Sequence, residues 1–151
     1  MSELMDLYQE VILDHNKKPR NRGTLEDADH EAKGDNPLCG DQLTLYLKMD
    51  GDRVTEIRFE GRGCAISVAS ASLMTETITG KSQSEIAALY ESFHELLTGD
   101  PSVAAEAGAE LGKLRVFEGV REFPVRVKCA TLAWHTLMAA LEGEDASVTT
   151  E

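Results

Sequence analysis

Residues 43–60 read LTLYLKMDGDRVTEIRFE, and this stretch decides the fold. Apolar residues alternate with polar or aromatic ones over residues 43–49, as they do in a strand that buries one face. The same alternation returns over residues 54–60, after a turn centred on Gly51. The stretch therefore predicts an antiparallel β-hairpin, whose apolar face other elements must cover.

Segments with helical periodicity lie on both sides of this hairpin. Before it, apolar residues recur at steps of three and four on one face of a predicted helix that ends near Lys18 and Pro19: Leu4, Leu7, Tyr8, Val11 and Ile12. Four helices are expected after it. The first covers residues 64–80, and the second begins at Ser82 with a capping box to Glu85. The third begins at Asp100 and Pro101, and the last covers residues 130–143.

The order of these elements predicts an α+β domain, with a small antiparallel sheet of about three strands and helices packed on one face. Residues 20–38 are expected to be loop, and residues 113–127 extended or irregular. With 151 residues, 42% of them hydrophobic, the chain is long enough for one core and too short for two. We therefore expect a single domain over residues 1–143 and a disordered tail over residues 144–151.

The charge of the chain restricts its partners. The formal net charge is -12 at pH 7, and both nucleic acids and anionic membranes repel such a surface. We expect neither as a partner, and basic proteins or metal ions are favoured. No run approaches the roughly 20 apolar residues of a membrane span, and the first residues lack the pattern of a secretory signal. The expected location is cytoplasmic.

The three cysteines lie at the ends of predicted elements rather than in their middles. Cys39 precedes the first strand, whereas Cys64 and Cys129 are expected to open helices, where free N–H groups favour a thiolate. With Asp41 as an oxygen donor, the thiols could complete a tetrahedral site for zinc or an iron-sulfur cluster. Their spacing matches no metal-knuckle pattern, so the residues alone leave open either a metal site or three unrelated thiols.

Four separate motifs match one known family in the same order. They are VILDHNKKPRNRG at residues 11–23, NPLCGD at 36–41, GRGCAISVASASLMTE at 61–76 and RVKCATLAWHTL at 126–137. Through them residues 8–141 resemble the U-type iron-sulfur cluster assembly family, which includes IscU, SufU and the N-terminal part of NifU. The chain is most similar to the SufU branch, because Lys128 stands where IscU has a histidine and residues 101–123 form a longer segment.

The resemblance implies a compact domain of SufE/NifU-like fold with a metal site made of Cys39, Asp41, Cys64 and Cys129. It implies an iron-sulfur cluster assembly protein that holds zinc and takes persulfide sulfur from a SufS-like cysteine desulfurase. The sulfur would pass to a downstream scaffold or to apo-protein recipients, a sulfurtransferase-like activity. Cys39 is the expected catalytic sulfur acceptor, because a residue on a surface turn can swing further than one at a helix end.

Two alternatives remain beside the sulfur acceptor. The first is a scaffold on which a [2Fe-2S] cluster is assembled from iron and sulfur on the same thiolates and transferred to apo-proteins. The second is a metal-stabilised binding module without sulfur chemistry.

Two basic residues close to the last cysteine are candidates for a supporting role. Arg126 is expected either to pair with Asp41 or a partner carboxylate, or to be a solvated charge. Lys128 is expected to face solvent or the partner.

Other polar residues have weaker signals. Arg20, Asn21 and Arg22, with the N-terminal helix, would form a docking surface for the desulfurase or simply a loop that covers the sheet. The histidines have no ligand spacing and are expected at the surface or in packing, with one of them half-buried beside Trp134. They are His15, His30, His94 and His135.

Overall fold

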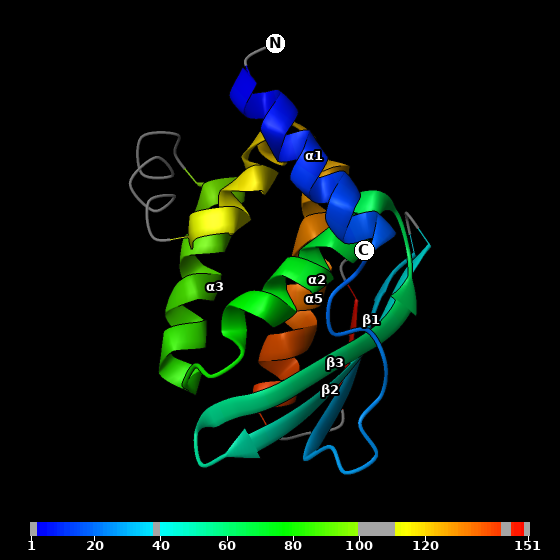
Figure 1. Ribbon diagram of the computed structural model, residues 1–151, viewed down its shortest axis with the longest axis vertical. Helices are drawn as coiled ribbons and strands as arrows, with labels where there is room; N and C mark the ends of the chain where they lie inside the picture. The colour runs from blue at the N-terminus through cyan, green and yellow to red at the C-terminus, as the bar shows by residue number, and fades with distance from the viewer. Residues whose placement is uncertain (1–2, 38–39, 100–110, 143–145, 150–151) are drawn as a thin grey trace.

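A computed structural model describes residues 3–37, 40–99, 111–142 and 146–149 of the chain, with the backbone alone for residues 3–5 and 146–149 (Figure 1). In these residues, helices α1, α2, α3 and α5, the 3-10 helix η1 and strands β1 to β4 follow one another along the chain. Their bounds are α1 Glu3–Lys17, β1 His30–Asn36, β2 Asp41–Asp50, β3 Arg53–Arg62, α2 Ala65–Ile78, α3 Gln83–Thr98, η1 Gly112–Glu122, α5 Pro124–Leu141 and β4 Ala146–Thr149.

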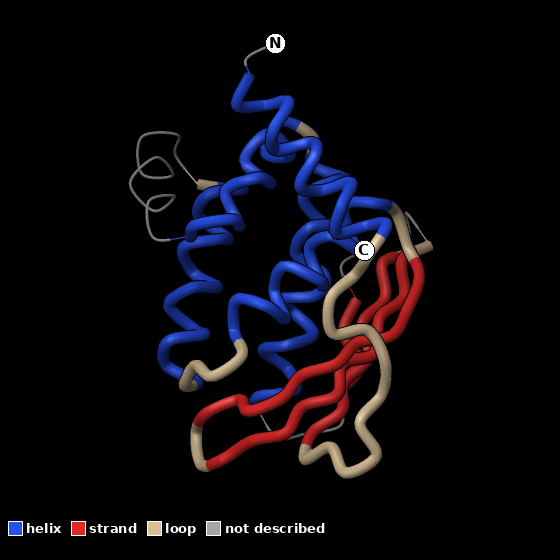
Figure 2. Tube along the Cα trace, viewed as in Figure 1, coloured by secondary structure: helices blue, strands red, loops and turns tan. Residues whose placement is uncertain are grey.

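The predicted hairpin is the centre of the sheet. Strands β2 and β3 pair antiparallel, with Leu45 opposite Phe59 and Leu47 opposite Ile57. These four side chains are buried, and the helices cover the sheet on one side (Figure 2). The prediction of an α+β domain with an antiparallel sheet and helices on one face is therefore confirmed.

The sheet has four strands in the order β3-β2-β1-β4, one more than the sequence predicted. Strand β1 was expected to be loop, since its sequence HEAKGDN contains little apolar surface. Its buried positions are Ala32, Gly34 and Asn36, so the alternation is there with small or polar residues in place of large apolar ones. Strand β1 pairs antiparallel with β2 along its whole length.

The C-terminal segment differs from its expected disorder. Residues Ala146–Thr149 form strand β4, which pairs parallel with β1 and places Ala146 beside Ala32. The open edge of β1 supplies the main-chain hydrogen-bonding groups with which β4 pairs. Side-chain composition does not report such pairing, so it gives no sign of this strand.

The segment over residues 113–127 also differs from the extended or irregular chain that the sequence predicted. Residues Gly112–Glu122 form η1, and α5 begins at Pro124, where proline suits the first helical turn. Cys129 therefore lies in the second turn of α5 rather than at its N-terminus. The helix start expected at Asp100 and Pro101 lies outside the described residues.

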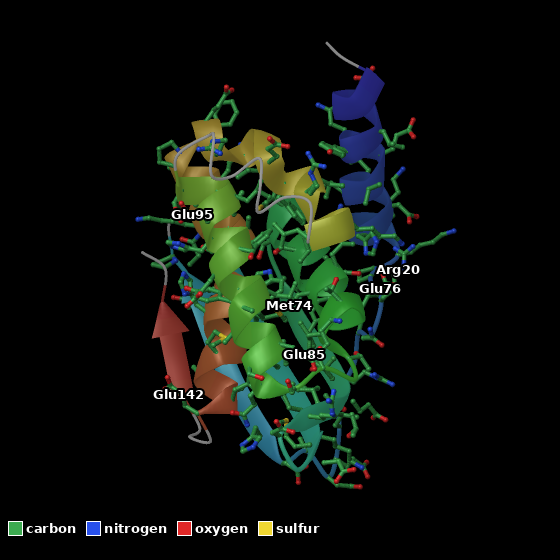
Figure 3. All side chains as sticks on the ribbon, turned by 90° about the vertical axis from the view of Figure 1, so that its left-hand side faces the viewer. Arg20, Met74, Glu76, Glu85, Glu95 and Glu142 are labelled. Carbon is green, nitrogen blue, oxygen red and sulfur yellow. The ribbon has the colours of Figure 1, made fainter. Side chains whose placement is uncertain are left out.

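The helices pack into one core against the sheet. Helices α2 and α5 lie next to the sheet. Met74 of α2 is fully buried, whereas Glu76 and Glu85 are exposed and Glu95 is half-buried (Figure 3). The aromatic ring of Trp134 stacks on Phe93 with 5.3 Å between centroids. Such aromatic pairs add about 0.5–1.5 kcal/mol to the effect of burial alone.

Local sequence signals set two of the other helices. The capping box is present as predicted: the Glu85 N–H donates to Ser82 Oγ, and the Ser82 N–H donates to the Glu85 carboxylate. Helix α1 packs Tyr8, Val11 and Ile12 against the core, although Leu7, expected on the same face, is exposed.

Close packing between β1 and α5 fixes the position of the last helix. A Cβ atom on Gly34 would overlap the hydroxyl of Thr136, so only glycine lets α5 approach this strand so closely. This contact holds α5, and Cys129 with it, against the end of the sheet that carries Asp41.

Candidate metal centre

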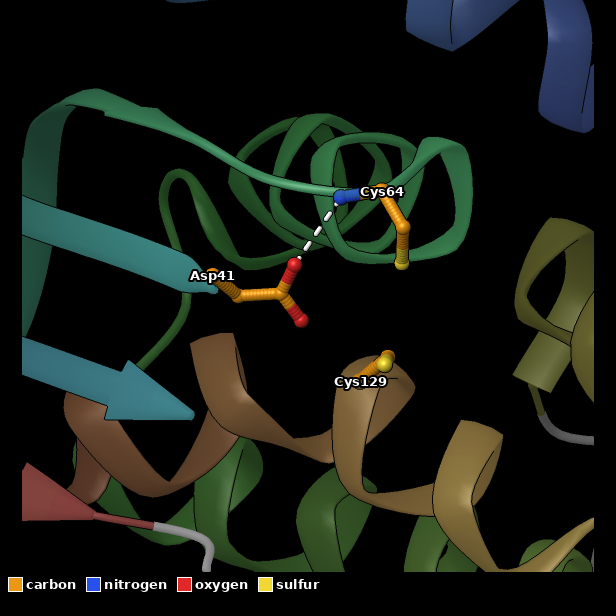
Figure 4. Close-up of side chains that lie close together, drawn as sticks. All are labelled: Asp41, Cys64 and Cys129. Atoms are coloured by element: carbon orange, nitrogen blue, oxygen red, sulfur yellow. Dashed lines mark hydrogen bonds between the residues drawn. The ribbon is translucent and has the colours of Figure 1, made fainter. Parts of the chain in front are cut away.

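Asp41 is the first residue of β2, and its side chain is fully buried. Its Oδ1 accepts a hydrogen bond of 2.9 Å from the backbone N–H of Cys64, the residue that caps the N-terminus of α2 (Figure 4). The carboxylate thus meets the positive end of a helix. Gly63 makes room for it, because a Cβ atom there would overlap the carboxylate.

The second carboxylate oxygen of Asp41 has a different environment. Oδ2 is buried, and within the described part of the chain it has no hydrogen-bond partner. A buried acceptor left in this state costs about 1–3 kcal/mol, and more when it is charged. A cation bound at Oδ2 would remove that cost.

Two sulfur atoms lie close to this carboxylate (Figure 4). A carboxylate oxygen of Asp41 and the Sγ atoms of Cys64 and Cys129 all lie within 4.8 Å of one another. In a tetrahedral zinc site, with bonds of about 2.0–2.3 Å, the ligand atoms are roughly 3.3–3.8 Å apart. Small side-chain movements would bring the three atoms to these separations.

The donor set fits a thiolate-binding metal. Two thiolates and one carboxylate, together with one further donor, match the ligands of zinc and of iron-sulfur clusters. The structure brings together Asp41, Cys64 and Cys129 of the four predicted ligands. Cys39, the fourth, lies outside the described residues.

The cluster opens to the surface on the side of Cys64. Cys129 is buried, and Cys64 is half-buried beside a hollow that both cysteines line together with Glu122, Phe123 and Arg126. A partner group could therefore reach Cys64 without the core being disturbed.

The two basic residues near Cys129 do not touch the carboxylate. Arg126 is exposed at the rim of this hollow, and Lys128 is half-buried. Within the described part of the chain neither side chain forms an ion pair, and the expected pair between Arg126 and Asp41 is absent.

Asn36 is a fourth member of the cluster that sequence reasoning missed. It is fully buried at the end of β1, and its amide Nδ2 lies 3.6 Å from the Sγ of Cys129. Its position at the start of the NPLCGD motif was the available signal. We call Asn36, Asp41, Cys64 and Cys129 the ligand corner.

A second buried polar cluster lies further along α2. His15 Nδ1 lies 2.7 Å from Ser72 Oγ, the Arg20 N–H donates to the same hydroxyl, and Asn21 Nδ2 donates to Thr75 Oγ1. Burial, reinforced by the nearby charge of Arg20, lowers the pKa of His15 despite the neighbouring carboxylate of Glu76. We call His15, Arg20, Asn21, Ser72 and Thr75 the closed corner.

The closed corner fixes the loop that follows α1. Asn21 has a positive φ of 59°, and its carbonyl accepts from the N–H of Phe59 in β3. Arg22 forms a bridge to the same strand and donates to the carbonyl of Gly61. These contacts match the expectation of a loop that covers the sheet, and the docking role of Arg20, Asn21 and Arg22 stays a prediction.

His135 occupies the place predicted for it. It is half-buried, and its Nδ1 lies 3.0 Å from the hydroxyl of Tyr90. Burial lowers the pKa of His135, as in a packing histidine.

A family model named the NifU-like N terminal domain matches residues 7–130, which include all of the ligand corner. The chain belongs to this family. It is 41% identical to the zinc-dependent sulfurtransferase SufU of Bacillus subtilis, over 95% of each chain. It is also 41% identical to the iron-sulfur cluster assembly scaffold protein IscU of Streptococcus pyogenes, over 94% of this chain and 87% of that one.

The fold of this chain is shared by a solved structure of a SufU from Fervidobacterium islandicum, a candidate iron-sulfur cluster assembly scaffold of the SUF system. The TM-score is 0.78 at 37% identity, over 93% of this chain and 99% of the other. Within its described residues, the present chain has no helix with the length and apolar character needed to cross a bilayer.

Proposed function

We propose that this protein is a zinc-bound sulfur acceptor in iron-sulfur cluster assembly, which takes persulfide sulfur from a SufS-like cysteine desulfurase and passes it on. The observation that carries the proposal is the approach of one carboxylate oxygen and two sulfur atoms to within 4.8 Å of one another. They come from three segments far apart in the sequence. The similarity to a zinc-dependent sulfurtransferase supports the choice of metal and activity.

Each donor atom of the proposed metal site has its own role. Cys64 and Cys129 would hold the metal from the two helices, and Asp41 would contribute Oδ2 while Oδ1 remains bound to the N–H of Cys64. Cys39 would be the fourth ligand. When bound, zinc supplies redox-inert coordination that keeps the thiols deprotonated and protects them from oxidation.

Cys39 is the proposed acceptor of sulfur. Its thiolate attacks the outer sulfur of the desulfurase persulfide, so that a new S–S bond forms while the original S–S bond breaks. The desulfurase cysteine leaves as a thiolate with the electron pair of the broken bond, and the outer sulfur keeps its proton. The step therefore needs no external oxidant or reductant.

The desulfurase would approach along the open side of the site. The hollow beside Cys64 has Arg126 and Glu122 on its rim, and Phe123 and Val125 expose large apolar side chains there. Arg126 would then meet a carboxylate of the partner. The recipients of the sulfur would be a downstream scaffold or apo-proteins.

A scaffold on which a [2Fe-2S] cluster is assembled is the second candidate function. The relative from Streptococcus pyogenes is an iron-sulfur cluster assembly scaffold protein, and the same cysteines would bind the cluster. Lys128 in place of the histidine of IscU favours the sulfur acceptor.

The test combines metal analysis with a sulfur-transfer assay. Protein purified without added ions is expected to contain about one zinc per chain and to raise the turnover of its desulfurase. After reaction with the desulfurase, intact-mass spectrometry should show a gain of one sulfur atom. Cys39→Ser should keep its fold and fail to accept sulfur. A Cys39→Ser chain that still takes up sulfur contradicts the assignment of Cys39. Desulfurase turnover that is the same with Cys39→Ser as with the wild-type chain supports a binding module.

A matched pair of carboxylate variants tests the ligand role of Asp41. Asp41→Ala should weaken zinc binding, whereas Asp35→Ala, on an exposed position of β1, should leave it unchanged. Equal zinc affinity in both variants would remove Asp41 from the ligand set.

A separate measurement tests the scaffold function. Visible absorption after anaerobic reconstitution, with transfer of the cluster to an apo-protein, would favour the scaffold.

A further inference from the structure

Asn36 occupies a buried position where an amide is unfavourable unless it has a specific partner. It is the last residue of β1, directly opposite Asp41 in the register of β1 and β2, and its relative exposure is 0%. Its Oδ1 is also buried, with no hydrogen-bond partner among the described residues. An unsatisfied amide oxygen costs about 1–3 kcal/mol, so folding alone would favour an apolar residue of the same size.

The other half of the amide has a partner, the sulfur of Cys129. Nδ2 donates toward Sγ over 3.6 Å, from a strand to a helix 93 residues further along the chain. The opposite orientation of the amide would direct Oδ1 at the sulfur, and a thiolate sulfur has no proton to donate to it. The observed orientation is therefore the favourable one.

We propose that Asn36 is a positioning residue, which donates an N–H···S hydrogen bond to the Cys129 thiolate and so orients it and withdraws electron density from it. The inference rests on the proposed metal-ligand role of Cys129. In the thiol form Cys129 donates to the carbonyl of Val125, 3.6 Å away. A metal-bound thiolate has no S–H proton and can only accept, so the contact with Val125 is lost while the contact with Asn36 persists.

This role gives one end of the sheet two functions at the same site. The β1–β2 end supplies a ligand through Asp41 and a hydrogen bond to a second ligand through Asn36. Groups that hydrogen-bond to metal ligands fix the direction of the ligand atom, and their removal usually weakens metal binding about 10–100-fold. We expect about a 10-fold loss for the single amide of Asn36.

A measurement on the wild-type protein tests the hydrogen bond directly. The chain is labelled with nitrogen-15 and loaded with cadmium-113, and scalar coupling is sought between cadmium and the side-chain amide protons of Asn36. Coupling is expected, because an N–H···S hydrogen bond to a metal thiolate transmits it. Coupling from cadmium to the Cys129 Hβ protons without any to Asn36 overturns this inference. No coupling to the Cys129 Hβ protons contradicts the ligand role of Cys129 instead.

Variants of the same size test the effect on the metal. Asn36→Leu removes both polar ends of the side chain, and Asn36→Asp keeps its shape without the N–H donor. Cobalt(II) is the probe, and both variants should shift the thiolate-to-cobalt charge-transfer band to longer wavelength and weaken cobalt binding about 10-fold. An unchanged band with unchanged affinity in either folded variant overturns the inference.

The matched control is Thr136→Val. Thr136 is buried on α5 against β1, like Cys129, but its hydroxyl donates only to the carbonyl of Leu132 within its own helix. Its loss should change neither the charge-transfer band nor the affinity for cobalt. A shift as large as that of the Asn36 variants would mean that any disturbance of the strand–helix interface acts on the metal, which overturns the specific role of Asn36.

Discussion

The ligand corner lies at the start of helix α2 and the closed corner further along it, and the two polar clusters differ in how their buried polar atoms are satisfied. In the closed corner, Nδ1 of His15 contacts Ser72, and Nε2 lies 3.5 Å from the carboxylate of Glu76. In the ligand corner, Asn36 Oδ1 and Asp41 Oδ2 are buried without hydrogen-bond partners in the described residues.

This difference indicates what each cluster does. Buried polar groups that are fully hydrogen-bonded fix a unique arrangement, whereas unsatisfied ones need a reason beyond folding. The closed corner ties α1 and its following loop to α2 through the Arg20 N–H, close to the exposed Glu76 (Figure 3). The ligand corner, at the start of α2, keeps donor atoms available for a metal. Stability should therefore depend on one corner and metal binding on the other.

Removal of the metal should have the largest effect. A ligand at a free concentration about 1,000 times its Kd stabilises the folded state by about 4 kcal/mol. For a chain of this length, that corresponds to a fall of about 8–16 °C in Tm when a chelator is added. Calorimetry of the zinc-loaded protein, before and after chelation, measures it. Equal Tm values would contradict a metal bound to the folded state.

Variants of the ligand corner should lose metal rather than stability. Cys64→Ser is expected to weaken zinc binding by more than about 100-fold, because even groups outside the ligand set contribute about 10–100-fold. In the presence of chelator its free energy of unfolding should stay within about 1 kcal/mol of wild type, since Cys64 is half-buried and serine is close in size. Chelator competition and urea unfolding give the two quantities. A Cys64→Ser chain with a much lower free energy of unfolding and a normal zinc affinity would contradict the difference between the two corners.

The closed corner should show the opposite pattern. Ser72→Ala removes the partner of the buried His15 Nδ1 and of the half-buried Arg20 N–H, and the loss should cost about 1–3 kcal/mol in stability. Zinc affinity should not change. Thr77→Ala, on the same helix with a half-buried hydroxyl that donates only to the carbonyl of Leu73, is the control and should cost less. Zinc affinity that falls with Ser72→Ala would show that the two corners are coupled.

The smallest effect should come from pH. The pKa of His15 is lowered in the folded state, so below the ordinary value of about 6.5 the unfolded chain binds this proton more readily. Stability is therefore present above that pH and is lost as the pH falls toward the lower folded-state pKa. The loss due to one histidine is at most about 1.4 kcal/mol per pH unit.

His15→Asn tests this contribution, because an asparagine amide can replace Nδ1 beside Ser72 and does not titrate. Urea unfolding with chelator between pH 7.5 and 5.5 should give a shallower fall for the variant than for wild type. The pKa of His135 is lowered as well, so part of the slope should remain. An equal slope in both chains would assign the whole effect to groups other than His15.

Local sequence predicted the parts of the fold that depend on local interactions. The hairpin, α1, α2 and the capping box of α3 were predicted because periodicity and capping involve residues a few positions apart. Strand β1 was missed because its buried residues, Ala32, Gly34 and Asn36, carry no apolar signal. Residues 113–127 were predicted to be extended or irregular because the packing that stabilises η1 and the first turn of α5 comes from other elements.

The candidate site was predicted in part for the same reason. The four motifs gave Asp41, Cys64 and Cys129, which the structure brings together. Asn36 was not predicted, because its role depends on a helix 93 residues away. The second-turn position of Cys129 also differed from the prediction, since the start of α5 depends on contacts with η1 and β1.

The sequence by itself determined the central hairpin, most of the helices and the family, and it predicted Asp41, Cys64 and Cys129 as candidate donors, because these follow from short patterns of side chains. Only the tertiary structure decided that a carboxylate and two sulfur atoms meet at one end of the sheet, and which polar atoms there stay without partners. The physical reason is that burial and hydrogen bonding depend on neighbours in space, and the packing of α2 and α5 on the sheet selects those neighbours.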